Sequence, residues 1–190
     1  MHDTDNERAH RLENQVRVNE LNPVQTLKKL GFKEGMTLCD IGAGTGIFSV
    51  PAAEISGTEV FALEISDEMI QVMERKKEAL QMEALKIVKV DSDTLPLEEG
   101  QCDMVLLVTV LHELSDKRAM LKEINRVLKP GGTLGIVEFH KRETPMGPPV
   151  QHRLDERFVQ ELCRTAQMGL RDSLELGDNF YVVVAQKSAE

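Results

Sequence analysis

The sequence predicts an α/β fold in which a mainly parallel sheet is covered by helices on both faces. Segments of strand type alternate with segments of helix type along most of the chain. An uninterrupted apolar run at 104–108 fits a strand that is buried on both faces. Glycine-rich chain links the first strand to the helix after it, and ligands of such sheets bind at the carboxyl ends of the strands.

The first half of the fold is predicted to contain three strands, preceded by a helix. Asn22 as N-cap, Pro23 at the first helical position and Gly31 just past the end delimit that helix. Helices follow the first strand and the second, where Ser66 is the expected N-cap. The alternation in the third strand indicates that it is less deeply buried. The strands are expected at 37–41, 60–63 and 85–90, and the helix after the first strand at 46–55.

The second half continues the alternation and ends in a hairpin. A helix over 116–128 is expected to stop at Lys129-Pro130-Gly131-Gly132, because proline cannot continue it. A fifth strand at 133–139 and a helix at 155–166 follow. Two last strands, 170–176 and 180–185, flank the polar turn Gly177-Asp178-Asn179, which is typical of an antiparallel hairpin.

Composition narrows the function classes. A chain of 190 residues predicts one domain, and its net charge of −9 gives no general affinity for nucleic acid. Aromatic residues make up 4%, which leaves few platforms for stacking bases. The sequence contains no apolar run of about 18 residues, so it predicts no membrane span. A small-molecule partner remains by elimination.

The cysteines and the N-terminus favour a cytoplasmic protein without a metal site. Cys39, Cys102 and Cys163 are odd in number and widely spaced, which fits buried thiols better than disulfides or a zinc knuckle. The N-terminus is polar and acidic, unlike a secretory signal. A zinc motif starting at His112-Glu113 would need histidine where Asp116 stands.

The sharpest motif is Asp40-Ile41-Gly42-Ala43-Gly44-Thr45-Gly46, where a strand turns into a helix. Its G-x-G-x-G spacing lacks the third glycine of a dinucleotide fingerprint, since position 47 is Ile47, and no P-loop lysine follows. Glycines let the backbone approach a ligand closely. Asp40 favours a ligand with an ammonium group over one with a pyrophosphate.

Two further strand ends carry polar residues. Glu64 follows the second strand, where a carboxylate can accept hydrogen bonds from both ribose hydroxyls. Asp91 and Ser92 follow the third strand and could meet an adenine ring. The three strand ends together suit one nucleoside-bearing ligand.

With these motifs the sequence resembles the class I S-adenosylmethionine-dependent methyltransferases, in particular small members similar to the ubiquinone/menaquinone-biosynthesis type. The resemblance covers about 22–186. It includes the glycine motif, Leu63-Glu64, Val90-Asp91-Ser92, Val110-Leu111-His112-Glu113-Leu114 and Leu128-Lys129-Pro130-Gly131-Gly132. It implies a three-layer, Rossmann-like, seven-stranded sheet of order 3-2-1-4-5-7-6, formed by 22–190. Residues 1–21 would be a helical lid or a tail.

The resemblance also implies S-adenosylmethionine as cofactor, S-adenosylhomocysteine as product and methyl transfer by direct displacement to a small molecule. Ile65 and Val108 join the expected cofactor site together with the residues above. A non-catalytic S-adenosylmethionine-binding module remains the alternative. A nicotinamide-dependent oxidoreductase is disfavoured by the glycine spacing.

Acceptor residues are expected after the fourth and fifth strands. His112 is predicted to act as a base or a substrate hydrogen-bonding group, or else to be a structural histidine. The stiff, locally basic segment 138–153 is either a surface crossover or a substrate wall, with Glu138, His140 and Arg153 facing the acceptor. The acceptor's identity and the oligomeric state stay open.

Overall fold

The computed structural model describes residues 5–91 and 94–189, and the chain divides into two compact units, Met1–Asp91 and Ser92–Glu190. The seven strands follow the order β3-β2-β1-β4-β5-β7-β6 in one sheet, which confirms the expected Rossmann-like topology.

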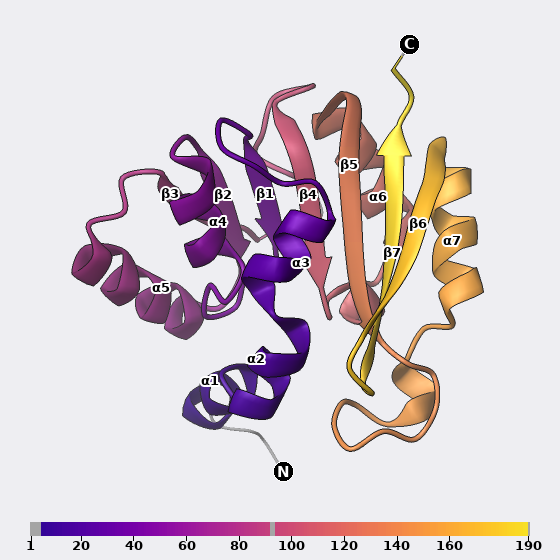
Figure 1. Cartoon of the computed structure of the whole chain (residues 1–190), viewed down its shortest axis with the longest axis horizontal. Helices are drawn as coiled ribbons and strands as arrows, with labels where there is room; N and C mark the ends of the chain where they lie inside the picture. Colours follow the sequence, from indigo (N-terminus) through magenta and orange to yellow (C-terminus); the bar gives the residue numbers. More distant parts are fainter. Residues whose placement is uncertain (1–4, 92–93, 190) are drawn as a thin grey trace. The chain divides into compact units, whose positions relative to one another are not determined.

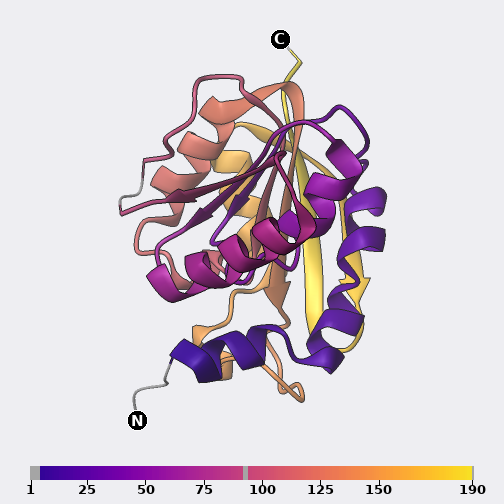
Figure 2. The same cartoon turned by 90° about the vertical axis from the view of Figure 1, so that its left-hand side faces the viewer.

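The first unit carries three parallel strands, in which β2 pairs with both β1 and β3. Because each step along the chain moves one strand further in the same direction, right-handed crossovers place α4 and α5 on one face. The helix α1 packs against α5 (Figure 2). The elements are α1 (Asp5–Leu12), α2 (Gln15–Leu21), α3 (Pro23–Lys29), β1 (Leu38–Ile41), α4 (Ser49–Ser56), β2 (Val60–Glu64), α5 (Asp67–Leu80) and β3 (Leu85–Lys89).

In the second unit β5 pairs in parallel with β4 and antiparallel with β7, and β7 pairs with β6 (Figure 1). The expected terminal hairpin is therefore confirmed. The helix α7 packs on β6 and also contacts α6. The elements are β4 (Cys102–Val108), the 3₁₀ helix η1 (Leu111–Glu113), α6 (Lys117–Val127), β5 (Leu128–Phe139), the 3₁₀ helix η2 (Val150–His152), α7 (Glu156–Thr165), β6 (Met168–Leu176) and β7 (Phe180–Lys187).

Burial follows the sequence pattern. The apolar run of β4 from Met104 to Leu107 is fully buried, as a strand covered on both faces requires. Only Leu85 is fully buried in β3, which confirms its predicted partial exposure. Cys39, Cys102 and Cys163 are buried free thiols. The side chains of Ser66 and Asp116 cap α5 and α6 by accepting from Met69 N and Ala119 N.

Two expected boundaries are wrong. The helix predicted at 46–55 begins at Ser49, because the glycine turn extends into the positions before it. The fifth strand begins at Leu128, not at 133. Leu128 pairs with Cys102 and Thr133 with Met104, so residues 129–132 form an irregularity within the strand. A Cβ at Gly132 would lie 2.8 Å from Lys129 O, which explains the glycine there.

Asn22 does not use its side chain to cap α3. Its φ of 38° places it in the left-handed region, where it ends α2 by donating its backbone N–H to Val18 O. The two helices therefore meet at a single residue, and the proline that follows fixes the start of α3. Within the described residues no helix combines the length and the apolar character needed to cross a membrane.

Candidate functional site

The glycine loop follows β1 in the first unit. Gly42, Gly44 and Gly46 have φ values of 68°, 58° and 82°, all in the left-handed region that a Cβ disfavours. The N–H groups of Gly42 and Ala43 both donate to Leu63 O at the end of β2, at 2.8 and 3.0 Å. The loop is therefore held against the neighbouring strand by its own backbone.

Glu64 organises the end of β2. Its Oε2 accepts from Gly44 N at 2.7 Å, and its Oε1 accepts from Ile65 N and Ser66 N at 2.9 and 3.0 Å. The side chain is almost entirely buried. A carboxylate oxygen can accept two hydrogen bonds, and among the described residues Oε2 receives only that of Gly44. One acceptor position thus remains for a ligand hydroxyl.

Asp40 lies behind the loop and is 2% exposed. Its Oδ2 accepts from the Ser49 hydroxyl at 2.6 Å, which ties β1 to the first residue of α4. Burial, together with the nearby charge of Glu64, raises the pKa of Asp40 to about 7 against the opposing effect of the Ser49 hydrogen bond. The structure therefore gives this carboxyl an internal partner, and its predicted contact with a ligand ammonium stays a prediction.

The remaining predicted cofactor residues of the first unit differ in exposure. Ile65 is 65% exposed directly beside Glu64. Thr45 is fully buried within the loop. Asp91 is exposed just after β3, and Ser92 lies outside the described residues. A carboxylate with acceptor capacity next to an exposed apolar side chain fits a ribose and its attached base.

The N-terminal helices reach the glycine loop, which sequence reasoning left open. A Cβ on Gly44 would lie 3.1 Å from Leu12 Cδ1, so the end of α1 contacts this glycine. Lys76 of α5 donates to Thr45 O at 2.7 Å and forms an ion pair with Glu13 at 2.6 Å. A single lysine thus links the loop to the chain that follows α1.

In the second unit, His112 and Glu138 form a tight pair. Glu138 lies near the end of β5, and its Oε2 is 2.8 Å from His112 Nδ1. Its Oε1 accepts from the backbone N–H of His112 at 3.1 Å. The Glu138 side chain is fully buried and that of His112 is 8% exposed. Glu138 was expected to face the acceptor, whereas its carboxylate here holds the histidine.

The turn between β4 and His112 is strained. Val108 ends β4 and is half-buried, and Thr109 after it has a φ of 58°. This left-handed conformation is costly for a β-branched residue. Its N–H donates to Val137 O at 2.7 Å, which holds the turn against β5. The strained turn directs the chain so that η1 returns to Glu138.

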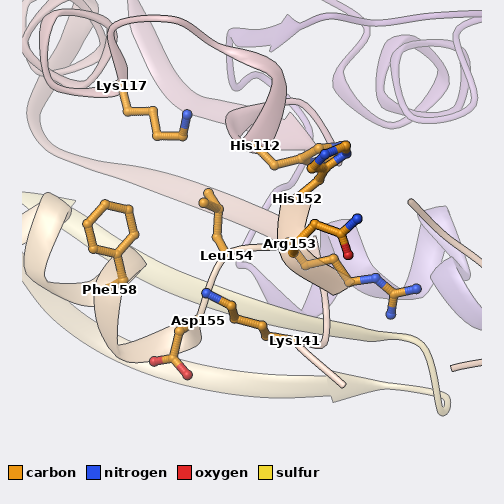
Figure 3. A pocket seen from close by; sticks show the side chains of 9 residues that line it. His112, Lys117, Lys141, His152, Arg153, Leu154, Asp155 and Phe158 are labelled. Carbon is orange, nitrogen blue, oxygen red and sulfur yellow. The ribbon is translucent and has the colours of Figure 1, made fainter. Parts of the chain in front are cut away.

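A cavity of about 540 Å³ adjoins the histidine, and we call it the Lys117 cavity. Figure 3 shows the side chains of Lys117, Leu154 and Phe158 around this hollow. The volume lies within the range of small-molecule sites. Its lining comes from η1, α6, the segment after β5 and α7, and comprises His112, Lys117, Lys141, Gln151, His152, Arg153, Leu154, Asp155 and Phe158.

Arg153 is 4% exposed and holds the segment after β5 together. Its guanidinium donates to the carbonyls of Pro148, His140, Arg142 and Met146 and to the Thr144 hydroxyl, at 2.6–3.2 Å. It also lies 5.6 Å from the centre of the Phe139 ring. The structure therefore gives Arg153 a structural function, and direct binding of an acceptor by this residue stays a prediction.

His140 is placed next to the hairpin. Its Nε2 lies 2.6 Å from Glu175 Oε2, and its ring centre is 5.6 Å from that of Tyr181. It lines a smaller hollow of about 210 Å³, so the structure does not bring it to the Lys117 cavity. In the part of the chain that is described, no group of three or more His, Cys, Asp or Glu is arranged to hold a metal ion.

Comparison with known proteins agrees with this geometry. Residues 39–136 match a family described as a methyltransferase domain. The demethylmenaquinone methyltransferase of Oceanobacillus iheyensis is 33% identical over 115 residues, which cover 60% of this chain and 48% of that protein. The chain spans about half the length of the curated relatives it matches.

Solved structures extend the similarity to nearly the whole chain. A SAM-dependent methyltransferase from Aquifex aeolicus has a TM-score of 0.89 and 27% identity, covering 97% of this chain and 99% of that one. The [4+2]-cyclase SpnF, with a TM-score of 0.79 and 18% identity, covers 90% of this chain and 81% of its own, and shows the fold alone. The chain thus belongs to the methyltransferase domain family, as a class I member whose cofactor is S-adenosylmethionine.

Proposed function

We propose that this protein transfers the methyl group of S-adenosylmethionine to a small molecule. The observation that carries the proposal is the buried Glu64 carboxylate, which holds the left-handed glycine loop and keeps an acceptor position beside the exposed Ile65. The similarity to demethylmenaquinone methyltransferases supports an acceptor of low molecular mass.

Each group at the first unit has a proposed task. Glu64 accepts a hydrogen bond from a ribose hydroxyl, Ile65 packs on the base, and Asp91 and Ser92, which follow β3, bind the adenine ring. The glycine loop, from Gly42 to Gly46, lets the methionine part approach the backbone. S-adenosylmethionine supplies a methyl group activated by a positive sulfonium. The protein's own contribution is to hold donor and acceptor in line, which can supply much of the acceleration.

Residues 1–21 are proposed to form a segment that closes over the glycine loop, with the methyltransferase domain spanning 22–190. The contact of Leu12 with Gly44 and the Glu13–Lys76 ion pair support this division. Val108 keeps its proposed place in the cofactor site, and Arg153, which lines the Lys117 cavity, keeps its place in the acceptor site although protein groups hold its guanidinium. His140 lines the smaller hollow instead and pairs with Glu175.

Calorimetry tests the cofactor assignment. S-adenosylmethionine and S-adenosylhomocysteine are expected to bind, and Gly44→Val is expected to abolish binding because its side chain would fill the space where the backbone meets the ligand. Gly35→Val is the matched control, since Gly35 also has a left-handed φ, of 79°, but no neighbour within 4 Å of a Cβ. Tighter binding of NAD than of either ligand would overturn the assignment.

A measurement of methyl transfer distinguishes the proposed methyltransferase from a non-catalytic binding module. Transfer of a labelled methyl group to any small molecule in a cell extract supports the proposed function. Cofactor binding without transfer to any acceptor would instead identify a non-catalytic S-adenosylmethionine-binding module. The [4+2]-cyclase SpnF, which shares this fold, illustrates why the fold alone does not decide this question.

A further inference from the structure

We propose that the His112–Glu138 pair removes a proton from the methyl acceptor, and that this acceptor is an anionic molecule whose reacting group is a hydroxyl on an aromatic or enolic ring. This inference rests on the proposed function and specifies its substrate class. It combines the geometry of the pair with the lining of the Lys117 cavity.

The geometry leaves one ring nitrogen for a substrate. Nδ1 of His112 is 2.8 Å from the buried Glu138 carboxylate, so it carries the proton that this carboxylate accepts. Nε2 is 3.9 Å from Glu113 Oε1, beyond hydrogen-bond distance, and the residue lines the Lys117 cavity. A buried carboxylate that orients an imidazole in this way also stabilises the imidazolium formed when Nε2 takes a proton.

The charged groups around the ring keep it basic. Burial by itself would lower the pKa of His112, but the hydrogen bond and charge of Glu138, together with the charge of Glu113, raise it above its ordinary value. Lys117 acts in the opposite direction. The other ionisable groups of the cavity are Lys141, His152, Arg153 and Asp155.

The pKa of a hydroxyl decides whether His112 can remove its proton, and this favours a hydroxyl on an aromatic or enolic ring. A phenolic hydroxyl has a pKa of about 10, within about 3 to 4 units of an imidazole near neutral pH, so an imidazole can accept its proton during the reaction. A simple alcohol is a far weaker acid, comparable to water, and its pKa lies too far above that of imidazole for such a transfer. An aliphatic amine acceptor is itself cationic at neutral pH, and the two lysines and the arginine of the cavity would repel it.

The rest of the lining fits an anionic ring. Lys117 and Lys141 bring ammonium groups to the cavity, and Asp155 is the one acidic residue in its lining. Leu154 and the 46% exposed ring of Phe158 provide apolar surface. An apolar ring would pack on these two side chains while a carboxylate or another anionic group pairs with a lysine.

The proposed step balances in atoms and charge. The acceptor's O–H bond breaks and its proton goes to His112 Nε2. The electron pair left on oxygen forms a new bond to the methyl carbon, while the bond from that carbon to sulfur breaks and its pair stays on sulfur. The imidazolium then returns its proton to solvent, and the products are a methyl ether and a neutral thioether.

The first test measures the histidine itself, without any acceptor. In protein labelled with ¹⁵N-histidine, NMR is expected to show the Nδ1–H tautomer of His112 and a titration midpoint above 6.5. Glu138→Gln should lower that midpoint by about one pH unit or more, because the opposing charge is lost. Glu113→Gln, the same change at the more distant carboxylate, should lower it less. An Nε2–H tautomer, or a midpoint unchanged in Glu138→Gln, would overturn the inference.

The second test identifies the acceptor class. Protein and methyl-labelled S-adenosylmethionine are incubated with an extract of the source organism, separated beforehand into anionic, neutral and cationic fractions. Label is expected in the anionic fraction as a methyl ether, with at least a hundredfold loss in His112→Gln. Label only in neutral or cationic products would overturn the acceptor class but leave methyl transfer intact. Absence of label from all fractions would overturn the proposed function as well.

The pH profile of the labelled reaction shows whether Glu138 positions His112 and raises its pKa or only stabilises the fold. Neutral His112 is the active form, so the rate should rise with pH through its titration midpoint and then level off. Glu138→Gln should move the rising limb to lower pH and reduce the plateau, and Glu138→Asp should restore part of both. If the pH profile of Glu138→Gln keeps the native midpoint, and its rate falls only because less protein is folded, the proposed role of Glu138 is contradicted.

Discussion

The glycine loop of the first unit and the Lys117 cavity of the second unit are built from different parts of the chain. The loop relies on backbone N–H groups, left-handed glycines and one buried carboxylate. The cavity relies on long side chains from η1, α6, α7 and the segment between β5 and α7. A site made of backbone depends on a local sequence pattern. A site made of side chains from distant segments can change its specificity by single substitutions.

The largest expected effect concerns the arginine that supports the cavity. Arg153→Ala removes the donor for four carbonyls and the Thr144 hydroxyl, and it should lower the free energy of unfolding by about 3 to 5 kcal/mol. Lys141→Ala, at an exposed position of the same segment, should change it by less than about 0.5 kcal/mol. Urea denaturation measures both. Equal stabilities of the two variants would show that Arg153 does not hold the segment.

The next effect tests the buried carboxyl behind the glycine loop. The folded-state pKa of Asp40, about 7, lies above its unfolded value of about 3.9. Its contribution to stability is therefore fully present below about pH 4 and is lost as the pH rises through 7. The Asp40→Asn variant has no such titrating group. Between pH 4 and pH 8 the unfolding free energy of Asp40→Asn should therefore rise, relative to that of the native protein, by about 3 to 4 kcal/mol.

Denaturation at several pH values checks this shift, and Asp67→Asn is the control. Asp67 is mostly exposed and pairs with Lys89 at the surface, so its substitution should leave the pH dependence nearly unchanged. Parallel stability curves for Asp40→Asn and the native protein would show that Asp40 is ionised when buried.

The smallest of these effects concerns cofactor affinity. Glu64→Ala should weaken binding of S-adenosylhomocysteine by about 1 to 3 kcal/mol, since a ribose hydroxyl loses a charged acceptor and three backbone N–H groups lose theirs. Glu59→Ala, the same change at the residue before β2, should leave the affinity as it is. Calorimetry measures both, and an unchanged affinity in Glu64→Ala would place this carboxylate outside the site.

Local patterns predicted most of the fold and the first-unit site. The apolar run of β4 and the polar turn before β7 specified their strands because burial and turn chemistry are encoded in a few neighbouring residues. Gly42, Gly44 and Gly46 were identifiable because few other residues adopt their backbone conformation. Glu64 was singled out from its position at the end of a strand, and its contact with the cofactor stays a proposal.

Long-range pairing accounts for what the sequence did not predict. Glu138 was expected on a substrate wall, and its pairing with His112 was not predicted. The parallel register of β4 and β5 brings η1 back to Glu138, and no local signal in the chain marks that register. The early start of β5 depends in the same way on Cys102 pairing with Leu128, against a local Pro-Gly-Gly pattern that indicates a turn. Lys117 and Phe158 had no distinguishing motif at all.

The contact between Leu12 and Gly44 has a kinetic consequence. A ligand that approaches Gly44 from the side of Leu12 can enter only as fast as α1 moves away, and it can leave only when α1 moves again. The Glu13–Lys76 pair that links this segment to the loop is partly exposed to solvent. Salt screens such pairs, so ionic strength would alter how long a ligand resides at the loop as well as how tightly it binds.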